Sequence, residues 1–397
     1  MGFRTAQTRI VMLACFLAAV PLGLASSQAS ANDSIIRLPA PSGPYAIGYR
    51  RFELVDSNRT ETQGRRRGPR RIVVHAWYPA RDREGPRASY MDSITARAWA
   101  EAHRLPLGFQ HNVVVGAALA PAILDTVAAL PVLLFSHGRA WPVLTYQAML
   151  HDLASRGWVI AGISHPHQEL TTPFADGSVA QLDRDLPPEQ PARGKALSLE
   201  VDVLVQDARH VLNALARWNG AANHPFQKAL DLTRVGYFGH SLGGSAAAHA
   251  LGRDPRILAA ATIEGSVFDS VARPLRVDRP LLSIIGGYNE NELSLRDFRP
   301  GPTGVVYEAL VRGAWHASFA DLLHVYGATA SPQWRRNHRR ELSPVRVNQI
   351  TTDYLDAFFA RYLEGKPSIL LRPHSPQDLG SYLTSGYPEV ELRIVVY

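Results

Sequence analysis

The sequence predicts an α/β fold with a mostly parallel, doubly wound sheet and helices on both faces. From about residue 70 onward, short apolar segments of strand length alternate with longer segments of helical periodicity. Continuous apolar segments are typical of strands that are buried on both faces, as in parallel sheets. Strands that alternate with helices in this way indicate one domain rather than several.

Seven apolar segments are predicted to form the strands of this sheet. The first, Ile72–Tyr78, is rich in β-branched and aromatic residues and is followed by Pro79. The others are Leu130–Phe135, Trp158–Ile163, Val235–Phe238, Ala259–Ile263, Leu281–Ile285 and Val305–Val311. Each contains four to eight residues, which is the usual length of a strand.

Two longer segments have apolar residues at spacings of three and four, which indicates helices with one buried face. One runs from about Leu199 to Trp218, and the other from Ile350 to Leu363. Gly365 and Pro367 are expected to end the second helix.

Two regions do not follow the alternation. Residues 91–125 are rich in alanine and are expected to be partly helical. Residues 166–197 contain five prolines and few apolar side chains, which predicts an irregular surface insertion. The insertion follows the carboxyl end of a strand, where ligands approach an open α/β sheet. It therefore either borders the substrate site or is a plain surface loop.

The N-terminus has the pattern of a signal peptide over residues 1–31. Arg4 and Arg9 precede an apolar stretch, and Ala29-Ser30-Ala31 has the small residues that a signal peptidase recognises. The alternative is a membrane anchor, although the apolar stretch is short for a bilayer span. We therefore predict a secreted or periplasmic protein with one domain at 32–397. No transmembrane segment is expected in the mature chain.

The single cysteine, Cys15, lies in this signal peptide. The mature protein would therefore have neither a disulfide nor a zinc site built on thiolates.

The formal net charge is +7, and much of the excess lies in the basic stretch Arg65–Arg71. Gly64, Gly68 and Pro69 place this stretch in a loop between the strand-like segments 51–56 and 72–78. Without aromatic or base-reading elements it does not indicate nucleic-acid binding. A solvated hairpin tip is the prediction.

The strongest chemical signal is the sequence G-H-S-L-G-G at Gly239–Gly244. A β-like segment precedes it and the small residues 245–248 follow it, so the pattern is strand, sharp turn, helix. This is the context of a nucleophile elbow, in which Ser241 would be held out at the sheet edge. Gly239 and Gly243 would be required because the turn is tight.

A serine hydroxyl needs a neighbouring base, and the base needs a carboxylate that fixes its tautomer. In this kind of fold the acid and then the histidine follow the serine along the chain. Glu264 lies directly after the strand at 259–263 and is the favoured acid. Its rivals in the same interval are Asp269, Asp278 and Asp297.

His316 is the favoured base because it follows the last predicted strand, where the third triad residue is expected. The alternatives are His324 in a following helix, His338 in a basic stretch and His374 beyond the last helix. His240 is next to Ser241, but neighbouring elbow residues point in different directions, so it is rejected as the base.

The developing oxyanion requires two N–H donors. One is the backbone N–H of Leu242, which follows the nucleophile. The other is assigned to the backbone N–H of Arg139, because His137-Gly138 follows the apolar strand at 130–135.

Taken in order, several segments resemble the plasma-type platelet-activating-factor acetylhydrolases and their bacterial relatives, which are similar to dienelactone-hydrolase-like and polyester-cleaving enzymes. The matching segments are Trp77–Ala80, Phe135–Gly138, Asp152–Val159, Gly239–Gly244 and His316–Asp321.

This resemblance implies an α/β-hydrolase fold and a serine, acid and histidine triad that acts on carboxylic esters without a metal or cofactor. Two positions depart from the family. Glu264 stands where aspartate is usual, and Arg139 stands where a small or apolar residue is commoner, so its cation is expected to alter which ester groups fit.

The sequence thus predicts hydrolysis of a lipid-like or short-acyl ester, a small molecule, through an acyl-serine intermediate. The alternatives are an amidase or peptidase with the same triad, a non-catalytic binding protein of the same fold, and a metal-dependent hydrolase suggested by His165-Pro166-His167. The oligomeric state is not indicated.

Overall fold

The computed structural model describes residues 35–64, 67–125, 128–183, 186–268, 274–287, 297–329, 342–372 and 383–397. Residues Ser34–Tyr397 form one compact unit. The predicted signal peptide at 1–31 lies outside the described residues. Within the described ranges, no helix combines the length and the apolarity that a bilayer crossing requires.

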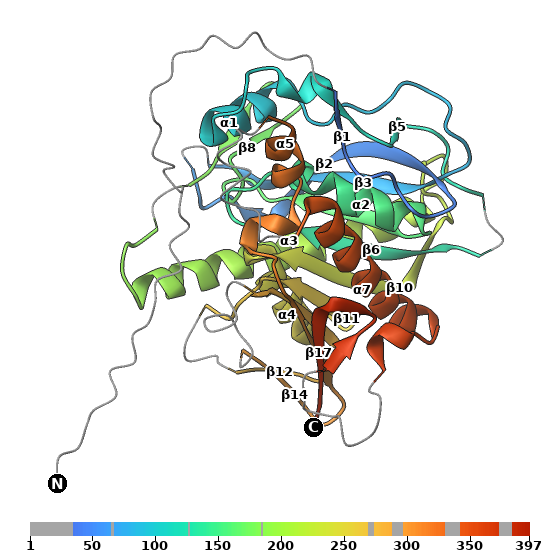
Figure 1. Cartoon of the computed structure of the whole chain (residues 1–397). Coiled ribbons are helices and arrows are strands. Elements are labelled where there is room, and N and C mark those ends of the chain that lie inside the picture. Colours follow the sequence, from blue (N-terminus) through green and yellow to red (C-terminus); the bar gives the residue numbers. More distant parts are fainter. Residues whose placement is uncertain are drawn as a thin grey trace. The chain divides into compact units, whose positions relative to one another are not determined.

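An eleven-stranded sheet forms the centre of this unit (Figure 1). Its strands are β2 (Ala46–Thr60), β3 (Pro69–Ala80), β5 (Ala118–Leu119), β6 (Leu130–Ser136), β7 (Val159–Ser164), β10 (Leu230–His240), β11 (Ile257–Ile263), β13 (Leu281–Gly286), β15 (Val305–Val311), β16 (Leu383–Ser385) and β17 (Tyr387–Val396). Small two-stranded sheets pair β1 (Ile36–Arg37) with β4 (Val113–Val114), β8 (Thr171–Pro173) with β9 (Val179–Gln181), and β12 (Leu275–Val277) with β14 (Phe298–Pro300).

The order of the strands is β16-β17-β15-β13-β11-β10-β6-β7-β3-β2-β5. The six strands from β15 to β7 are all parallel. The strands β3 and β17 join this core in the antiparallel direction, on opposite sides. All seven predicted strands are present, so the prediction of a mostly parallel α/β sheet is confirmed. The antiparallel β17 was not predicted, because its side chains alternate between buried and partly exposed positions.

Helices cover both faces of the sheet, as predicted. They are α1 (Ser93–His103), α2 (Gln147–Ser155), α3 (Ala192–Gly220), α4 (Leu242–Arg253), α5 (Leu322–Thr329) and α7 (Pro344–Glu364), with the short 3-10 turns η1 (Phe109–Asn112), η2 (Val143–Tyr146), η5 (His316–Phe319) and η6 (Ile369–Leu371). Successive side chains of β6 point to opposite faces of the sheet and so contact different helix layers. Leu133 and Phe135 pack with α2 and α7, whereas Val132 and Leu134 pack with α3 and α4.

The ends of α7 follow from local sequence. The Ser343 hydroxyl accepts a hydrogen bond from the Arg346 N–H, and Pro344 occupies the first helical position, where a missing N–H costs nothing. Gly365 follows Glu364 in the left-handed conformation, with φ 70°, and so ends the helix as predicted.

The region at 166–197 is less irregular and less exposed than predicted. It contains the hairpin of β8 and β9, and α3 already begins at Ala192. Its first part is buried although it is polar, since Gln168 and Glu169 are almost fully removed from solvent. Apolar content alone does not indicate this burial, because these polar groups form hydrogen bonds with Arg70 and Thr172.

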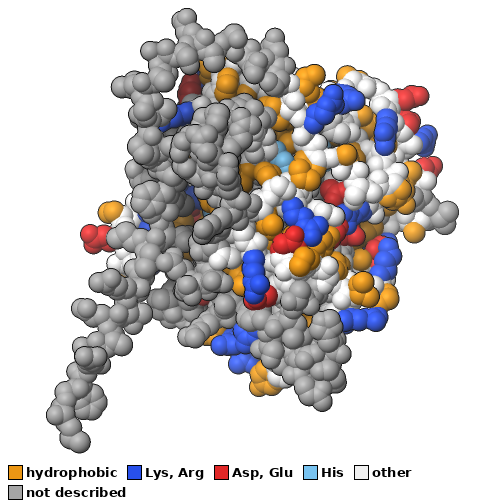
Figure 2. Space-filling view, in the orientation of Figure 1, with side chains coloured by type: hydrophobic (Ala, Val, Ile, Leu, Met, Phe, Trp, Pro, Cys, Tyr) orange, Lys and Arg blue, Asp and Glu red, His pale blue; other side chains and the backbone are white. Residues whose placement is uncertain are grey.

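The basic stretch at 65–71 is only partly a solvated tip. Arg65 and Arg66 lie outside the described residues. Arg70 is 3% exposed and its guanidinium binds Asp207 and Glu61, and Arg71 pairs with Glu53. Figure 2 shows acidic and basic side chains interspersed over the visible face. These pairings balance part of the charge of the stretch within the protein, and the absence of nucleic-acid binding stays a prediction.

Candidate active site

Ser241 lies at a sharp turn between β10 and α4. Its φ is 53° and its ψ is −116°, a strained conformation for a residue with a side chain. The Ser241 N–H donates to the Ile263 carbonyl at 2.8 Å, and the Ser241 carbonyl accepts from the Ser245 N–H at 3.0 Å. These bonds hold the strained turn between the end of the sheet and the first turn of α4.

The two glycines of the turn are required by close backbone approach. A Cβ atom at Gly243 would lie 2.1 Å from the Ser136 carbonyl oxygen, and one at Gly239 would lie 2.4 Å from the Gly243 carbonyl carbon. Because no side chain fits there, α4 approaches the end of β6. Gly138 is thereby brought so close to the nucleophile that a Cβ on it would be 3.3 Å from Ser241 Cβ.

Glu264 and His316 are brought together at the same edge of the sheet. Glu264 directly follows β11, and its own N–H donates to the Ile284 carbonyl at 2.8 Å. Its Oε2 lies 3.2 Å from His316 Nδ1, and its Oε1 accepts from the Gly286 N–H. The Glu264 side chain is fully buried, whereas that of His316 is 32% exposed. Since an ionised carboxylate can only accept, Nδ1 carries the proton and Nε2 is left as an acceptor.

The described rivals of Glu264 and His316 have other surroundings. Asp297 Oδ2 accepts from the Ser266 hydroxyl and the Val267 N–H, and Asp278 is exposed. His324 lies within α5, where burial lowers its pKa to about 4. Asp269, His338 and His374 lie outside the described residues.

His240 supports His316 from behind. The two rings are 4.5 Å apart, and His240 Nε2 donates to the His316 carbonyl at 3.0 Å. His240 Nδ1 accepts from the Tyr146 hydroxyl at 2.9 Å. Burial holds the pKa of His240 well below its usual range, so the ring is neutral. Both nitrogens are therefore occupied, which agrees with the rejection of His240 as the base.

Ser241 Oγ makes no hydrogen bond with His316 in the described part of the chain. Catalytic hydrogen bonds of this type are often long until a substrate is bound. What the geometry supplies is a strained serine, a buried carboxylate and a histidine with a free acceptor nitrogen, all at one edge of the sheet.

The two predicted oxyanion donors are both available. In the described chain, the N–H groups of Arg139 and Leu242 have no hydrogen-bond partner, whereas the residues on either side of Arg139 do. The Gly138 N–H donates to the Tyr146 hydroxyl at 3.2 Å, and the Ala140 N–H donates to the Gln168 carbonyl at 2.7 Å. Leu242 is the first residue of α4, so its N–H points out of the helix end.

The Arg139 side chain does not present a free cation. Its Nε lies 2.8 Å from Glu200 Oε2 on α3, and its Nη2 donates to the Asp183 carbonyl. The prediction that this cation alters the fit of ester groups remains a prediction, but the charge is balanced by a buried carboxylate.

Aromatic side chains pack next to His240, and the sequence pattern did not indicate them. Trp141 packs edge-on against His240 at 5.9 Å and against Trp99 of α1 at 5.2 Å. Trp99 in turn contacts His103 at 3.6 Å. The region around 91–125 had only been predicted to be partly helical. The signal available in the sequence was Trp99 within the segment that forms α1.

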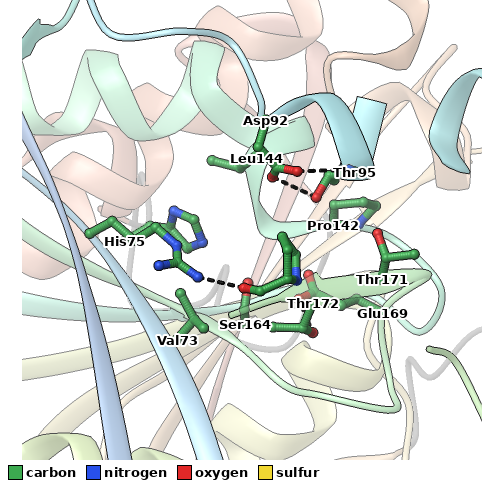
Figure 3. A pocket seen from close by; sticks show the side chains of 12 residues that line it. Val73, His75, Asp92, Thr95, Pro142, Leu144, Ser164, Glu169, Thr171 and Thr172 are labelled. Atoms are coloured by element: carbon green, nitrogen blue, oxygen red, sulfur yellow. Dashed lines mark hydrogen bonds between the residues drawn. The ribbon is translucent and has the colours of Figure 1, made fainter. Parts of the chain in front are cut away.

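Two hollows lie away from Ser241. One is a small enclosed cavity of about 10 Å³ beside Glu169, His75 and Ser164 (Figure 3). The other, of about 610 Å³, lies between α1, η1 and the β8–β9 hairpin.

The two histidines of His165-Pro166-His167, which suggested a metal site, form hydrogen bonds with protein groups instead. His165 binds Asp207 and Ser136, and His167 binds the Gln181 carbonyl. In the described ranges, no three histidine, cysteine or acidic side chains converge as metal ligands would.

No protein-family model matches the chain. A curated relative from Arthroderma benhamiae, described as a probable 1-alkyl-2-acetylglycerophosphocholine esterase, is 26% identical over 260 residues. The match covers 62% of this chain and 63% of the relative, less than two thirds of its length. Among solved structures, the ferulic acid esterase from Streptomyces cinnamoneus has a TM-score of 0.68 at 23% identity, over 90% of this chain and 99% of that one. This likeness confirms the predicted α/β-hydrolase fold.

Proposed function

We propose that the protein is a carboxylic ester hydrolase in which Ser241, His316 and Glu264 form the catalytic triad. The observation that carries the proposal is that a strained Ser241 lies at the same edge of the sheet as Glu264 and His316, whose Oε2 and Nδ1 are 3.2 Å apart. Strain of this kind persists only where the surrounding structure enforces it, and it concentrates at functional sites. Both similar proteins named above are described as esterases.

The mechanism follows from the acceptor nitrogen of His316. Nε2 takes the proton of the Ser241 hydroxyl as Oγ attacks the ester carbonyl, and it then gives that proton to the leaving alcohol. Water, activated by the same nitrogen, releases the acid from the acyl-serine. The N–H groups of Arg139 and Leu242 stabilise the oxyanion in both steps.

The substrate class is a lipid-like or short-acyl ester. The relative's description names an acetyl ester of a glycerophospholipid, and the structural neighbour acts on an ester of an aromatic acid. The ring of Trp141, which is partly exposed and packs against His240, suits an apolar or aromatic group, because flat rings bind well against such side chains. A secreted or periplasmic location completes the proposal and rests on the N-terminal sequence alone. N-terminal sequencing of exported protein tests it, with Asn32 expected as the first residue.

The test is hydrolysis of p-nitrophenyl esters with two to twelve acyl carbons, together with methyl ferulate, by wild type and Ser241→Ala. We expect wild-type turnover on at least one ester and a loss of about 10⁴-fold or more in the variant. Ser57→Ala, which removes an exposed hydroxyl on β2, is the matched control and should keep full activity.

A second readout separates the alternatives. A fluorophosphonate should label wild type once, at Ser241, and should not label the alanine variant. Faster turnover of an amide than of the matched ester would favour an amidase. A wild type that neither turns over esters nor reacts with the probe would leave only a binding role.

A further inference from the structure

A second hydrogen-bonded chain of serine, histidine and aspartate side chains lies next to residues 137–140, which we call the oxyanion loop. The proposed mechanism does not use this hydrogen-bonded chain. Ser136 Oγ lies 2.7 Å from His165 Nε2, and His165 Nδ1 lies 2.9 Å from Asp207 Oδ2. The order of contacts is that of a catalytic triad. All three side chains are fully buried, however, so substrate cannot reach Ser136.

The charges in this chain fix the direction of every hydrogen bond. Although burial alone would raise it, the Arg70 guanidinium at 2.6 Å holds the pKa of Asp207 well below its usual range. Burial also lowers the pKa of His165, so the ring is neutral and donates from Nδ1 to the Asp207 carboxylate. His165 Nε2 then accepts from the Ser136 hydroxyl, which in turn accepts from the Tyr237 hydroxyl at 2.6 Å.

The backbone of His165 connects this chain to the oxyanion loop. Its N–H donates to His137 Nε2 at 3.2 Å. His137 therefore carries its proton on Nδ1, which donates to the Gly138 carbonyl at 2.8 Å. The same carbonyl also accepts from the Trp141 N–H at 3.0 Å. Burial lowers the pKa of His137 to about 3, so the ring is neutral.

The carbonyl that His137 holds belongs to the same peptide unit as the Arg139 N–H. In a planar trans peptide, the carbonyl and the N–H point in opposite directions. When His137 fixes the Gly138 carbonyl, it also fixes the direction of the Arg139 N–H. That N–H is one of the two proposed oxyanion donors and has no other partner in the described chain.

We propose that His137 is a positioning residue that aims the Arg139 N–H at the oxyanion, and that Ser136, His165 and Asp207 lock His137 in place. This inference rests on the proposed function, because it assigns a task within that site. His137 touches neither the substrate nor a reacting atom. Its effect is therefore on kcat, since the oxyanion develops only as the reaction proceeds.

Two substitutions at His137 separate its two hydrogen bonds. In His137→Asn, the side-chain amide nitrogen occupies the place of Nδ1 and can still donate to the Gly138 carbonyl. In His137→Gln, the amide reaches the place of Nε2 and can meet the His165 N–H, but it leaves no donor at Gly138. The inference therefore predicts that the asparagine variant keeps activity and the glutamine variant loses it.

The measurements are kcat and KM on p-nitrophenyl butyrate and the inhibition constant of a trifluoromethyl ketone, which forms a tetrahedral oxyanion adduct. We expect kcat of H137Q to fall about 10- to 100-fold, less than the full 10²–10³-fold loss of a donor, because Trp141 still holds the carbonyl. The ketone should bind more weakly by the same factor, and KM should change less than threefold. H137N should stay within about threefold of wild type, and the shape of the pH profile should be unchanged in both.

His151→Leu is the matched control, because His151 is equally buried but lies on α2 with no bond to the oxyanion loop. Its kcat should be that of wild type even if its stability falls. Ser136→Ala provides an independent arm that removes only one hydroxyl, and we expect kcat to fall several-fold with KM unchanged.

Equal kcat values for H137N and H137Q, or a wild-type kcat in H137Q, would overturn the inference while leaving the esterase proposal intact. If neither His137 variant folds, Ser136→Ala decides, and a wild-type kcat there would overturn it. A wild type without ester turnover would remove both the function and this inference.

Discussion

Replacing Glu264 with glutamine tests the acid of the proposed triad at the level of single hydrogen bonds. Both carboxylate oxygens of Glu264 face donors, Gly286 N–H on Oε1 and His316 Nδ1–H on Oε2. A glutamine amide has only one oxygen and cannot accept both bonds. If that oxygen takes the Gly286 N–H, the NH₂ group faces Nδ1 and forces the proton of His316 onto Nε2. In this tautomer the histidine cannot accept the Ser241 proton.

The expected loss follows from this tautomer argument. Isosteric replacement of a triad acid in serine proteases lowers kcat by about 10⁴ for the same reason. We expect about 10³–10⁴ here, which corresponds to about 4–5.5 kcal/mol of transition-state stabilisation. KM should change little, because Glu264 is buried behind His316 and does not reach the substrate.

The assay is steady-state hydrolysis of the best p-nitrophenyl ester from pH 5 to pH 9, with thermal unfolding measured on the same samples. Asp278→Asn is the matched control, because it neutralises an exposed rival carboxylate and should keep wild-type kcat. A folded Glu264→Gln variant within tenfold of wild type would refute Glu264 as the acid.

Three further predictions concern the surrounding scaffold. Gly243→Ala places a Cβ 2.1 Å from the Ser136 carbonyl oxygen, so we expect a loss of about 3 kcal/mol or more in urea unfolding. An unfolding midpoint equal to wild type would contradict the close approach. Arg139→Ala leaves Glu200 buried without its cation and should cost about 3 kcal/mol, yet it keeps its backbone N–H and hence kcat within about tenfold. Loss of kcat as large as in Ser241→Ala would show that the side chain itself acts. Burial raises the pKa of Glu169 to about 8. The folded state therefore binds more protons than the unfolded state between pH 4.5 and pH 8, and stability falls as pH rises through this window. Glu169→Gln removes that dependence, so its stability relative to wild type should rise by up to about 5 kcal/mol from pH 4.5 to pH 8. The same difference at both pH values would refute this.

Much of the candidate site could be predicted from local sequence. The elbow at 239–244 depends on neighbours within a few residues, because a strand, a turn without side chains and a helix must follow each other directly. Glu264 and His316 were predicted because the carboxyl ends of parallel strands share one edge of the sheet. That rule alone brings an acid that directly follows β11, and a histidine in the loop just after β15, to the edge of the sheet where Ser241 lies.

The buried polar chain could not be predicted in the same way. Arg70 was expected in solvent, and 166–197 was expected to cross the surface. Arg70, His165 and Asp207 come from β3, the loop after β7 and α3. Their pairing depends on which strands are neighbours and on how far α3 lies from the sheet. No spacing within the sequence records either quantity.

The sequence by itself determined the fold class, the order in which strands and helices follow each other along the chain, and the residues of the elbow. Each of these depends on short-range pattern and steric fit. Only the tertiary structure decided that Glu264 Oε2 meets His316 Nδ1, that Trp141 packs against His240, and that His137 Nδ1 lies against the Gly138 carbonyl. The first two depend on distances between residues far apart in the sequence, 52 residues for Glu264 and His316, and such distances are set by the packing of the whole core.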